Sequence, residues 1–246
     1  MDFHCHLDIY PSAKAVSEEA ALRNEFTWLV TTSPRAYKAT SKVLGHIPRV
    51  LITPGLHPEL VESRAGELFQ LLEQMERVAA VGEVGIDGSY RFKSSLSEQR
   101  QVFDAIVSRS RELGGRVLSI HSRGAVREVL SILLKYPGFG TAVLHWFTGT
   151  IAEMEAAYKM GCWFSMGPAA FESAAGRALA AKLPRDRVVP ESDGPFAKEN
   201  GATVQPWSMR RTAHLFAPHW ECTEHEALAT LNANGQRLLH TMGWTS

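Results

Sequence analysis

Apolar residues along the chain form short runs that alternate with longer amphipathic stretches. The runs have the length and composition of β-strands and cover residues 2–6, 28–32, 50–53, 78–84, 117–120, 141–144, 162–166 and 187–189. Several stretches between them carry apolar residues at helical spacing, for example Leu68, Leu71, Leu72 and Met75. Eight strands that alternate with helices are typical of a closed parallel barrel. We therefore predict an α/β protein with the (β/α)8 TIM-barrel fold.

Polar residues at the starts of the amphipathic stretches support these helices. Ser33 precedes Pro34, the order expected for an N-cap followed by the first helical position. Residues 95–98, 150–153 and 223–226 each begin with Ser or Thr and end with Glu, which is the pattern of a capping box. The sequence therefore predicts that helices begin at these places.

Length and composition fit one soluble barrel. The chain has 246 residues, close to the roughly 250 residues of a typical barrel, so we expect a single domain over residues 1–246. Apolar residues make up 45% of the chain, enough for one large core. No apolar run reaches the roughly 18 residues of a membrane span, and no signal-peptide pattern is visible. Cys5, Cys162 and Cys222 are odd in number and widely spaced, which favours a reducing, cytoplasmic compartment. Because no apolar run is long enough to span a membrane, we expect no membrane partner.

The charge balance limits the kind of nucleic-acid partner. The chain has 26 basic and 26 acidic residues, so its net charge is zero. An extended surface for duplex binding usually carries an excess of basic residues. A substrate held by a few phosphates beside metal ions does not need that excess.

Metal-binding side chains recur where the predicted strands end. They are His4, His6, His57, Glu83, His121, His145 and Asp193. Parallel strands bring their C-terminal ends to one face of a barrel, so these distant residues are expected to meet there. Imidazoles and carboxylates together suit divalent ions such as zinc and manganese, and such ions activate water for hydrolysis. The sequence therefore predicts a metal-dependent hydrolase.

The first of these residues also have structural interpretations. Asp2, His4 and His6 share one side of a strand and are potential ligands or orienting groups, although pairs of histidines also arise by chance. Glu83 lies inside an apolar run, where it is either a solvated strand end or a ligand. A buried carboxylate without a partner is costly, which favours the ligand.

The later residues leave similar alternatives open. A lone histidine at the end of an apolar strand is more often structural, but His121 and His145 occupy equivalent positions of successive strands, which favours metal binding. Asp193 precedes Gly-Pro and could form an Asx-turn. His57 could belong only to a turn, and Arg123 is either a surface charge or a clamp for phosphate.

The ordered motifs together resemble the TatD family of metal-dependent deoxyribonucleases, a branch of the amidohydrolase-like barrels. The resemblance runs from Asp2 to Leu239 and rests on Asp2-x-His4-x-His6-Leu7, Gly55-x-His57-Pro58, Gly82-Glu83-x-Gly85-x-Asp87, His121-Ser122-Arg123, His145-x-Phe147-x-Gly149, Glu191-x-Asp193-x-Pro195 and Asn234-x-x-Arg237-Leu238. Each motif is weak alone, but the ordered set is specific.

The resemblance implies two divalent ions, zinc, magnesium or manganese, that share Glu83. The first ion would be held by His4, His6, Glu83 and Asp193, and the second by Glu83, His121 and His145. A carboxylate has two oxygens and can bridge two ions, whereas an imidazole cannot do so without deprotonation.

The resemblance also implies roles in catalysis and substrate binding. Glu83, Asp193 and His57 would be catalytic, with Asp193 accepting a proton from water. His57 and Arg123 would face the phosphate of the substrate. Trp146 stands where the family usually has a small residue; it could narrow the pocket or stack on a base. The Arg-Asn-x-Pro segment of the family is replaced by residues 202–207, so no substrate contact is inferred there.

These inferences predict a two-metal phosphodiester hydrolase that acts on DNA, at the ends of single strands. One alternative is the hydrolysis of an ester or amide, such as deacylation of aminoacyl-tRNA. Another is a role within a larger defence or repair complex, as a nuclease subunit or as a non-catalytic scaffold. Intact ligand positions argue against a purely structural role.

Overall fold

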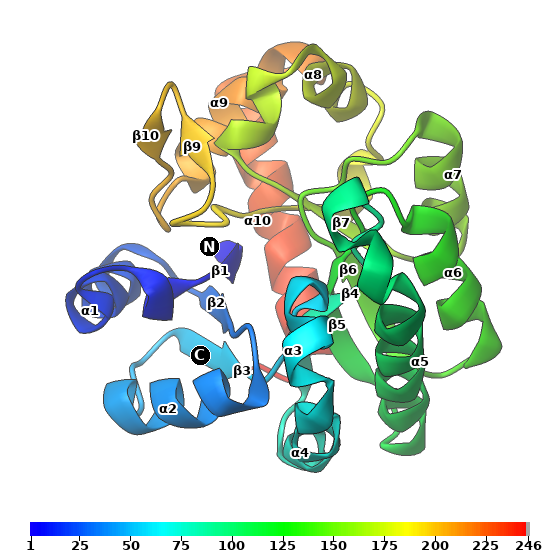
Figure 1. The fold of residues 1–246 in the computed structure, drawn as a ribbon. Helices are drawn as coiled ribbons and strands as arrows, with labels where there is room; N and C mark the ends of the chain where they lie inside the picture. Colours follow the sequence, from blue (N-terminus) through cyan, green and yellow to red (C-terminus); the bar gives the residue numbers. More distant parts are fainter. Residues whose placement is uncertain (245–246) are drawn as a thin grey trace.

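Eight parallel strands lie at the centre of the computed structural model, which describes residues 1–244 (Figure 1). They are β1 (Asp2–Cys5), β2 (Thr27–Val30), β3 (Val50–Thr53), β4 (Ala80–Gly85), β5 (Arg116–His121), β6 (Gly140–Leu144), β7 (Trp163–Met166) and β8 (Val188–Pro190). Each predicted run overlaps one of these strands, with ends that differ by at most two residues. The pattern of apolar runs therefore located every barrel strand.

Backbone hydrogen bonds join the strands into a closed ring. Strands β1 to β3 pair in order, as do β4 to β8. Between β8 and β1, Asp193 N–H donates to His4 O at 2.9 Å and His6 N–H donates to Gly194 O at 2.8 Å. On the other side, Gly82 N–H of β4 donates to Pro54 O, directly after β3, at 2.9 Å. The predicted (β/α)8 barrel is confirmed.

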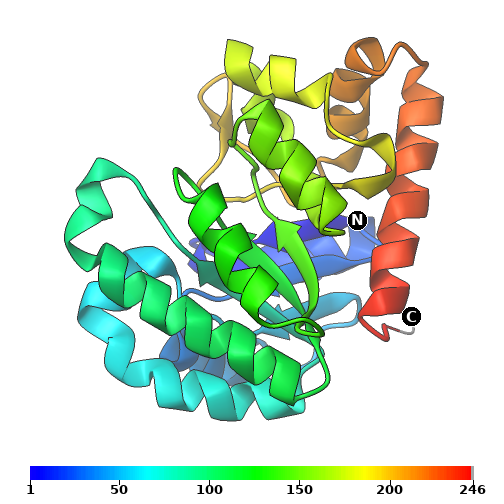
Figure 2. The same ribbon diagram turned by 90° about the vertical axis from the view of Figure 1, so that its right-hand side faces the viewer.

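Helices surround the strands, and Figure 2 shows the last of them, in red, along one edge of the molecule. They are α1 (Ala13–Arg23), α2 (Pro34–Leu44), α3 (Val61–Arg64), α4 (Leu68–Gln74), α5 (Leu96–Glu112), α6 (Val126–Lys135), α7 (Ile151–Lys159), α8 (Ala174–Ala180), α9 (Met209–His219) and α10 (Glu224–Thr241). A two-stranded hairpin of β9 (Lys198–Glu199) and β10 (Ala202–Thr203) lies between β8 and α9. Among residues 1–244, none of the helices has both the length and the apolar character needed to cross a membrane.

Apolar side chains from the strands and from α10 close the end of the barrel at which the strands begin. Phe3, Trp28 and Trp163 form one buried cluster there with Leu238 of α10. The amide of Asn234 donates to the carbonyls of β8 and the turn before it, at 2.6 and 2.7 Å. The terminal motif around Asn234 therefore holds α10 against the barrel, and the opposite, C-terminal face remains available for a site.

Three of the predicted helix starts are confirmed and one is wrong. Ser33 accepts a hydrogen bond from Ala36 N–H, and Thr150 and Thr223 each begin a complete capping box. Ser95 makes no capping bond because a 3-10 helix, Tyr90–Ser95, runs directly into α5. Its hydroxyl donates instead to Phe92 O at 3.2 Å.

Candidate metal centre

Glu83 of β4 lies at the centre of a cluster of histidines at the C-terminal face of the barrel. The side chain is almost completely buried. Its Oε1 lies 3.0 Å from His57 Nε2, 2.9 Å from His121 Nδ1 and 2.8 Å from His145 Nε2. Its Oε2 lies 3.5 Å from His4 Nε2 and 3.2 Å from His6 Nε2. The two carboxylate oxygens therefore face two different groups of histidines.

Asp193 completes the group on the Oε2 side. Its Oδ1 lies 3.6 Å from the Nε2 atoms of both His4 and His6. The backbone of Asp193 has a φ of 46°, a left-handed conformation that aspartate tolerates better than most residues. This turn directs the carboxylate toward β1, so that strands from the two ends of the barrel sequence meet at one point.

The donor set fits a divalent cation. Within the described chain, His4 Nε2 is buried without a hydrogen-bond partner, although it faces oxygens of Glu83 and Asp193. A ligand atom that faces two carboxylates across about 3.5 Å has the arrangement expected around an ion rather than in a direct hydrogen bond. Imidazole nitrogens and carboxylate oxygens are ligands of zinc and similar ions. Three sets of these side chains have ligand atoms close enough together to share an ion: His4, His6 and Glu83; His4, His145 and Asp193; and His57, Glu83 and His121.

The charged groups inside the cluster shift one another's pKa values. Burial would raise the pKa of Glu83, but the nearby His57, His145 and His121 outweigh it and hold that pKa well below its usual range. Burial would lower the pKa of His145, whereas Glu83 and Glu191 raise it well above its usual value. Burial raises the pKa of Asp193 to about 7. A cation beside Asp193 would favour its ionised form, which is the form that binds metal.

A cavity of about 810 Å³ opens above the cluster. The predicted substrate-binding residues His57, Arg123 and Trp146 all line it. Phe196, which the sequence did not single out, also lines it and is 57% exposed. The structure therefore brings every predicted metal-binding and substrate-binding residue to one place, with the metal candidates at the bottom and Arg123 at the exposed rim.

The model of the TatD related DNase family matches residues 1–240. The chain belongs to this family of metal-dependent hydrolases. It is 30% identical to the 3'-5' ssDNA/RNA exonuclease TatD of Citrobacter rodentium over 85% of each chain. It is 27% identical to human deoxyribonuclease TATDN3, covering 97% of this chain and 93% of that protein. The TatD homologue YJJV of Escherichia coli K12 has the same fold, with a TM-score of 0.84, 22% identity, and 98% and 96% of the two chains covered.

In this TatD-family protein, Asp87 orients one of the candidate metal ligands. His121 Nε2 lies 2.7 Å from Asp87 Oδ2, which leaves Nδ1 to face Glu83. Ser89 N–H donates to the other oxygen of Asp87, at 2.8 Å. Burial would raise the pKa of Asp87, but the bonds from His121 and Ser89 lower it to about 2. An ionised carboxylate fixes the tautomer of His121 with the proton away from the metal. The motif contained Asp87, but its partner could not be deduced from the sequence.

We expect Asp87→Asn to weaken metal binding by roughly 10- to 100-fold, as is typical when the partner of a metal-binding histidine is changed. The amide accepts a hydrogen bond from His121 less strongly than a carboxylate does. The measurement is titration of metal-free protein, with thermal unfolding as a check of the fold. Asp104→Asn, which changes an ion-paired aspartate on α5, is the control. Unchanged affinity in Asp87→Asn would contradict the orienting role.

Two further groups hold the ligands of β1. The hydroxyl of Ser119 lies 2.7 Å from His4 Nδ1, so His4 presents Nε2 to the cluster. Asp2, which the sequence left as either a ligand or an orienting group, accepts hydrogen bonds from the backbone N–H groups of His4 and Ser192 and from the Ser192 hydroxyl. Burial raises the pKa of Asp2 to about 8. Asp2 therefore ties β1 to the segment that carries Asp193 and does not join the metal cluster.

Glu191 supports the strand end that carries His145 and Trp146. Its Oε1 accepts the backbone N–H of Trp146 at 2.9 Å, and its Oε2 accepts the hydroxyl of Ser165. The same carboxylate lies 3.8 Å from His145 Nδ1. The glutamate of the Glu191-x-Asp193 motif thus positions its neighbours across the barrel.

His57 differs from the other histidines in its orientation. Its Nδ1 accepts the backbone N–H of Glu59 at 3.1 Å. A neutral imidazole carries one proton, so the proton is on Nε2, which points to Glu83. Although His57 lies close enough to Glu83 and His121 to share a metal, this tautomer makes it a hydrogen-bond donor. The contact with Glu59 favours the predicted role toward substrate over a metal-binding role.

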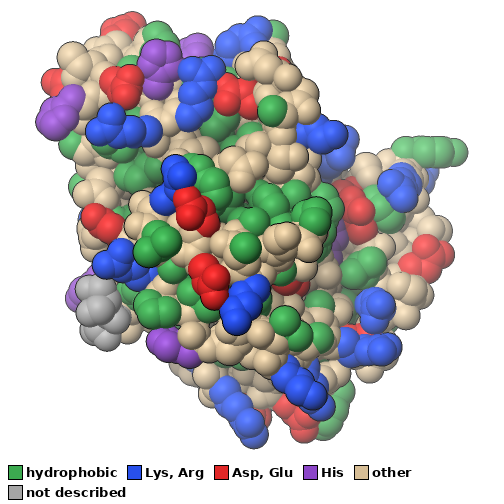
Figure 3. Space-filling model, turned by 90° about the vertical axis from the view of Figure 1, so that its left-hand side faces the viewer, with side chains coloured by type: hydrophobic (Ala, Val, Ile, Leu, Met, Phe, Trp, Pro, Cys, Tyr) green, Lys and Arg blue, Asp and Glu red, His purple; other side chains and the backbone are tan. Residues whose placement is uncertain are grey.

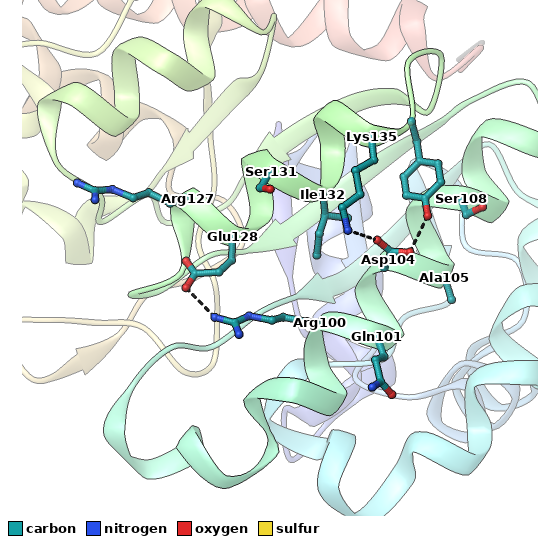
Figure 4. Close-up of a pocket in the computed structure, with 11 residues that line it drawn as sticks. Arg100, Gln101, Asp104, Ala105, Ser108, Arg127, Glu128, Ser131, Ile132 and Lys135 are labelled. Atoms are coloured by element: carbon teal, nitrogen blue, oxygen red, sulfur yellow. Dashed lines mark hydrogen bonds and ion pairs between the residues drawn. The ribbon is translucent and has the colours of Figure 1, made fainter.

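A second hollow lies on the outside of the barrel, between α5 and α6 (Figure 4). Its charged side chains satisfy one another: Arg100 pairs with Glu128 at 2.9 Å, and Asp104 binds both Lys135 and Tyr136. Among residues 1–244, those that line this hollow include none of the predicted metal ligands. Its charged residues therefore lie away from the candidate metal centre, and variants at these positions can serve as controls.

Proposed function

We propose that this TatD-family hydrolase cleaves phosphodiester bonds at the ends of single-stranded DNA with two divalent ions that share Glu83. The observation that carries the proposal is that the two carboxylate oxygens of Glu83 face different histidines. Oε2 faces His4 and His6, with Asp193 close by, and Oε1 faces His121 and His145. Each group would hold one ion. This division supports the assignment of His4, His6 and Asp193 to one ion, and His145 lies within reach of both sides of Glu83.

The bound ions would polarise the phosphate and lower the pKa of a nearby water. Asp193 faces the histidines through Oδ1, which leaves Oδ2 to accept the proton from that water. The Nε2–H of His57, which faces Glu83 Oε1 at 3.0 Å in this structure, would be shared with a phosphate oxygen of the bound substrate. Arg123, at the rim of the same cavity, would pair with the negative charge that develops during attack.

The nature of the substrate is supported by the relatives and by the charge distribution. One relative is named as an exonuclease of single-stranded DNA and RNA, and another as a deoxyribonuclease. Figure 3 shows a face on which Lys and Arg side chains are interspersed with Asp and Glu rather than gathered in a stripe. With a net charge of zero, long tracking along a duplex is disfavoured. The cavity of about 810 Å³ above the cluster offers a place for the end of a single strand.

The test is degradation of end-labelled single- and double-stranded DNA by protein that has been stripped of metal and reloaded with Mg²⁺, Mn²⁺ or Zn²⁺. We expect mononucleotides to be released faster from single strands, and a chelator to stop the reaction. Aminoacyl-tRNA and a simple ester serve as competing substrates. If either is cleaved rapidly while single-stranded DNA survives, the nuclease proposal is wrong and an acyl hydrolase replaces it.

Arg123→Ala should distinguish a phosphodiester from a neutral substrate. We expect kcat/KM on single-stranded DNA to fall by roughly 10-fold, since a hydrogen bond to a charged group contributes about 1.5 kcal/mol. Turnover of a neutral ester should stay the same, because that substrate lacks the charge that Arg123 would meet. Arg127→Ala is the matched control, since Arg127 is exposed and pairs with Glu153 outside the cavity. Equal losses on both substrates would argue against a phosphate contact.

A further inference from the structure

The strand order separates two kinds of side chain around the metal cluster. His57 and Arg123 lie beyond the ends of β3 and β5. Trp146 and Phe196 lie beyond the ends of β6 and β8, and among the described residues that line the cavity they are its aromatic side chains other than histidine. The strand between them, β7, is followed by Gly167, which has no side chain. Around the rim, the phosphate-binding candidates therefore follow β3 and β5 and the aromatic rings follow β6 and β8, with Arg123 and Trp146 beyond the ends of neighbouring strands.

Phe196 is exposed although its backbone is firmly held. Ala197 N–H donates to Asp193 O, and Val204 N–H donates to Ala197 O, both at 3.0 Å. A side chain at Gly194 would meet the hydroxyl of Tyr10 at 2.0 Å, so the turn that leads to Phe196 is tightly packed. The ring of Phe196 lies 5.0 Å from that of His6, nearly perpendicular to it. An ordered segment thus presents an uncovered aromatic ring beside a candidate metal ligand.

Trp146 is held just as firmly in an unfavourable backbone conformation. Its φ is 35°, a left-handed value that bulky residues rarely adopt. The hydrogen bond from its backbone N–H to the buried Glu191 maintains this conformation. Local strain of this kind is found mainly at functional sites. Here it places a half-buried indole at the wall of the cavity.

We propose that Phe196 and Trp146 form a slot for the base of the nucleotide at the scissile phosphate. The inference rests on the proposed function, because it assigns the base-binding part of the same site. Every nucleobase has a π-face, so stacking between two rings would hold any base and give little sequence preference. The base would lie toward β6 and β8, while the phosphate lies over Glu83 and next to Arg123. Phe196 is then a substrate-binding residue of this hydrolase.

The test compares two single-stranded oligonucleotides that differ only at their ends. One has natural terminal nucleotides, and the other carries a tetrahydrofuran abasic residue at both termini; the rate of the first cleavage is measured. We expect the wild-type protein to lose about 100-fold in kcat/KM on the abasic ends, the effect of two base–aromatic stacks. Phe196→Ala should lower kcat/KM about 10-fold on natural ends. On abasic ends it should have the same kcat/KM as the wild-type protein. Phe196→Tyr should restore the rate on natural ends.

Controls separate the slot from effects on the metal centre or on folding. Phe69→Ala removes an aromatic ring that is 71% exposed on α4, outside the cavity, and should leave both rates unchanged. Metal titration and thermal unfolding of Phe196→Ala should match those of the wild type. Equal losses on both oligonucleotides, or no loss on either, would overturn the slot. A wild-type protein that cleaves no DNA would overturn the proposed function, and the slot with it.

Discussion

Glu83→Gln is expected to lose metal from both halves of the centre and to reduce hydrolysis by at least about 10²-fold, because activation of water depends on the metal. The wild-type protein should bind close to two divalent ions per chain. Glutamine keeps one carbonyl oxygen but replaces the other with an NH₂ group, which cannot bind a cation. The change also removes the negative charge that Oε1 and Oε2 present to the surrounding histidines. Elemental analysis and titration of the metal-free protein measure the occupancy.

Glu128→Gln is the matched control for this experiment. Glu128 pairs with Arg100 at the surface of α6, so the variant changes charge in the same way without touching the centre. It should keep full occupancy and turnover. A folded wild-type protein that binds fewer than one ion per chain would contradict the two-metal model. Normal occupancy in Glu83→Gln would show that this carboxylate does not bridge.

The sequence predicted the barrel well because strand runs and helix starts are local signals. The run at residues 50–53 corresponds to β3 without any change, and the capping boxes at Thr150 and Thr223 formed as expected. The failure at Ser95 has a local cause as well. The capping pattern needs an extended residue before the helix, but the preceding segment is already helical, and Ser95 has a ψ of 2°. A four-residue pattern cannot report the conformation of the residues before it.

The candidate ligands were predictable for a different reason. Parallel strands bring their C-terminal ends together, so position at a strand end was enough to gather His4, Glu83 and Asp193. The orienting role of Asp87 was missed because its contact crosses between strands. Asp87 meets His121 across β4 and β5, and such a contact depends on register and side-chain direction. The periodicity of apolar residues gives no information about register or side-chain direction.

Phe196 was missed because its sequence context is ambiguous. A phenylalanine after Gly-Pro is as compatible with the core as with a ligand surface, and composition favours the core. Only the hairpin formed by β9 and β10 and the packing of the turn against Tyr10 leave its ring in the cavity. The hairpin includes part of the segment that departs from the family pattern, residues 202–207. A segment that departs from an expected family motif thus shapes the part of the site where we place the base.

Asp193→Asn and His145→Ala are each expected to keep the fold and lose hydrolysis by about 10²-fold or more, since both remove a group needed to activate water. Both residues follow strands and point into the cavity, and asparagine tolerates the left-handed backbone at position 193. Turnover of single-stranded DNA and thermal unfolding measure the two effects. His225→Ala, at an exposed position of α10, should be nearly silent.

Metal content should separate these variants from Glu83→Gln. Asp193 lies close to His4 and His6, which face Oε2 of Glu83, and also close to His145. Asp193→Asn should lose about one ion and keep the ion held near His121. His145→Ala should instead weaken the Oε1 side. Near wild-type turnover in either variant, with metal supplied, would place the chemistry elsewhere. Loss of both ions from Asp193→Asn would mean that the two halves of the centre bind metal only together.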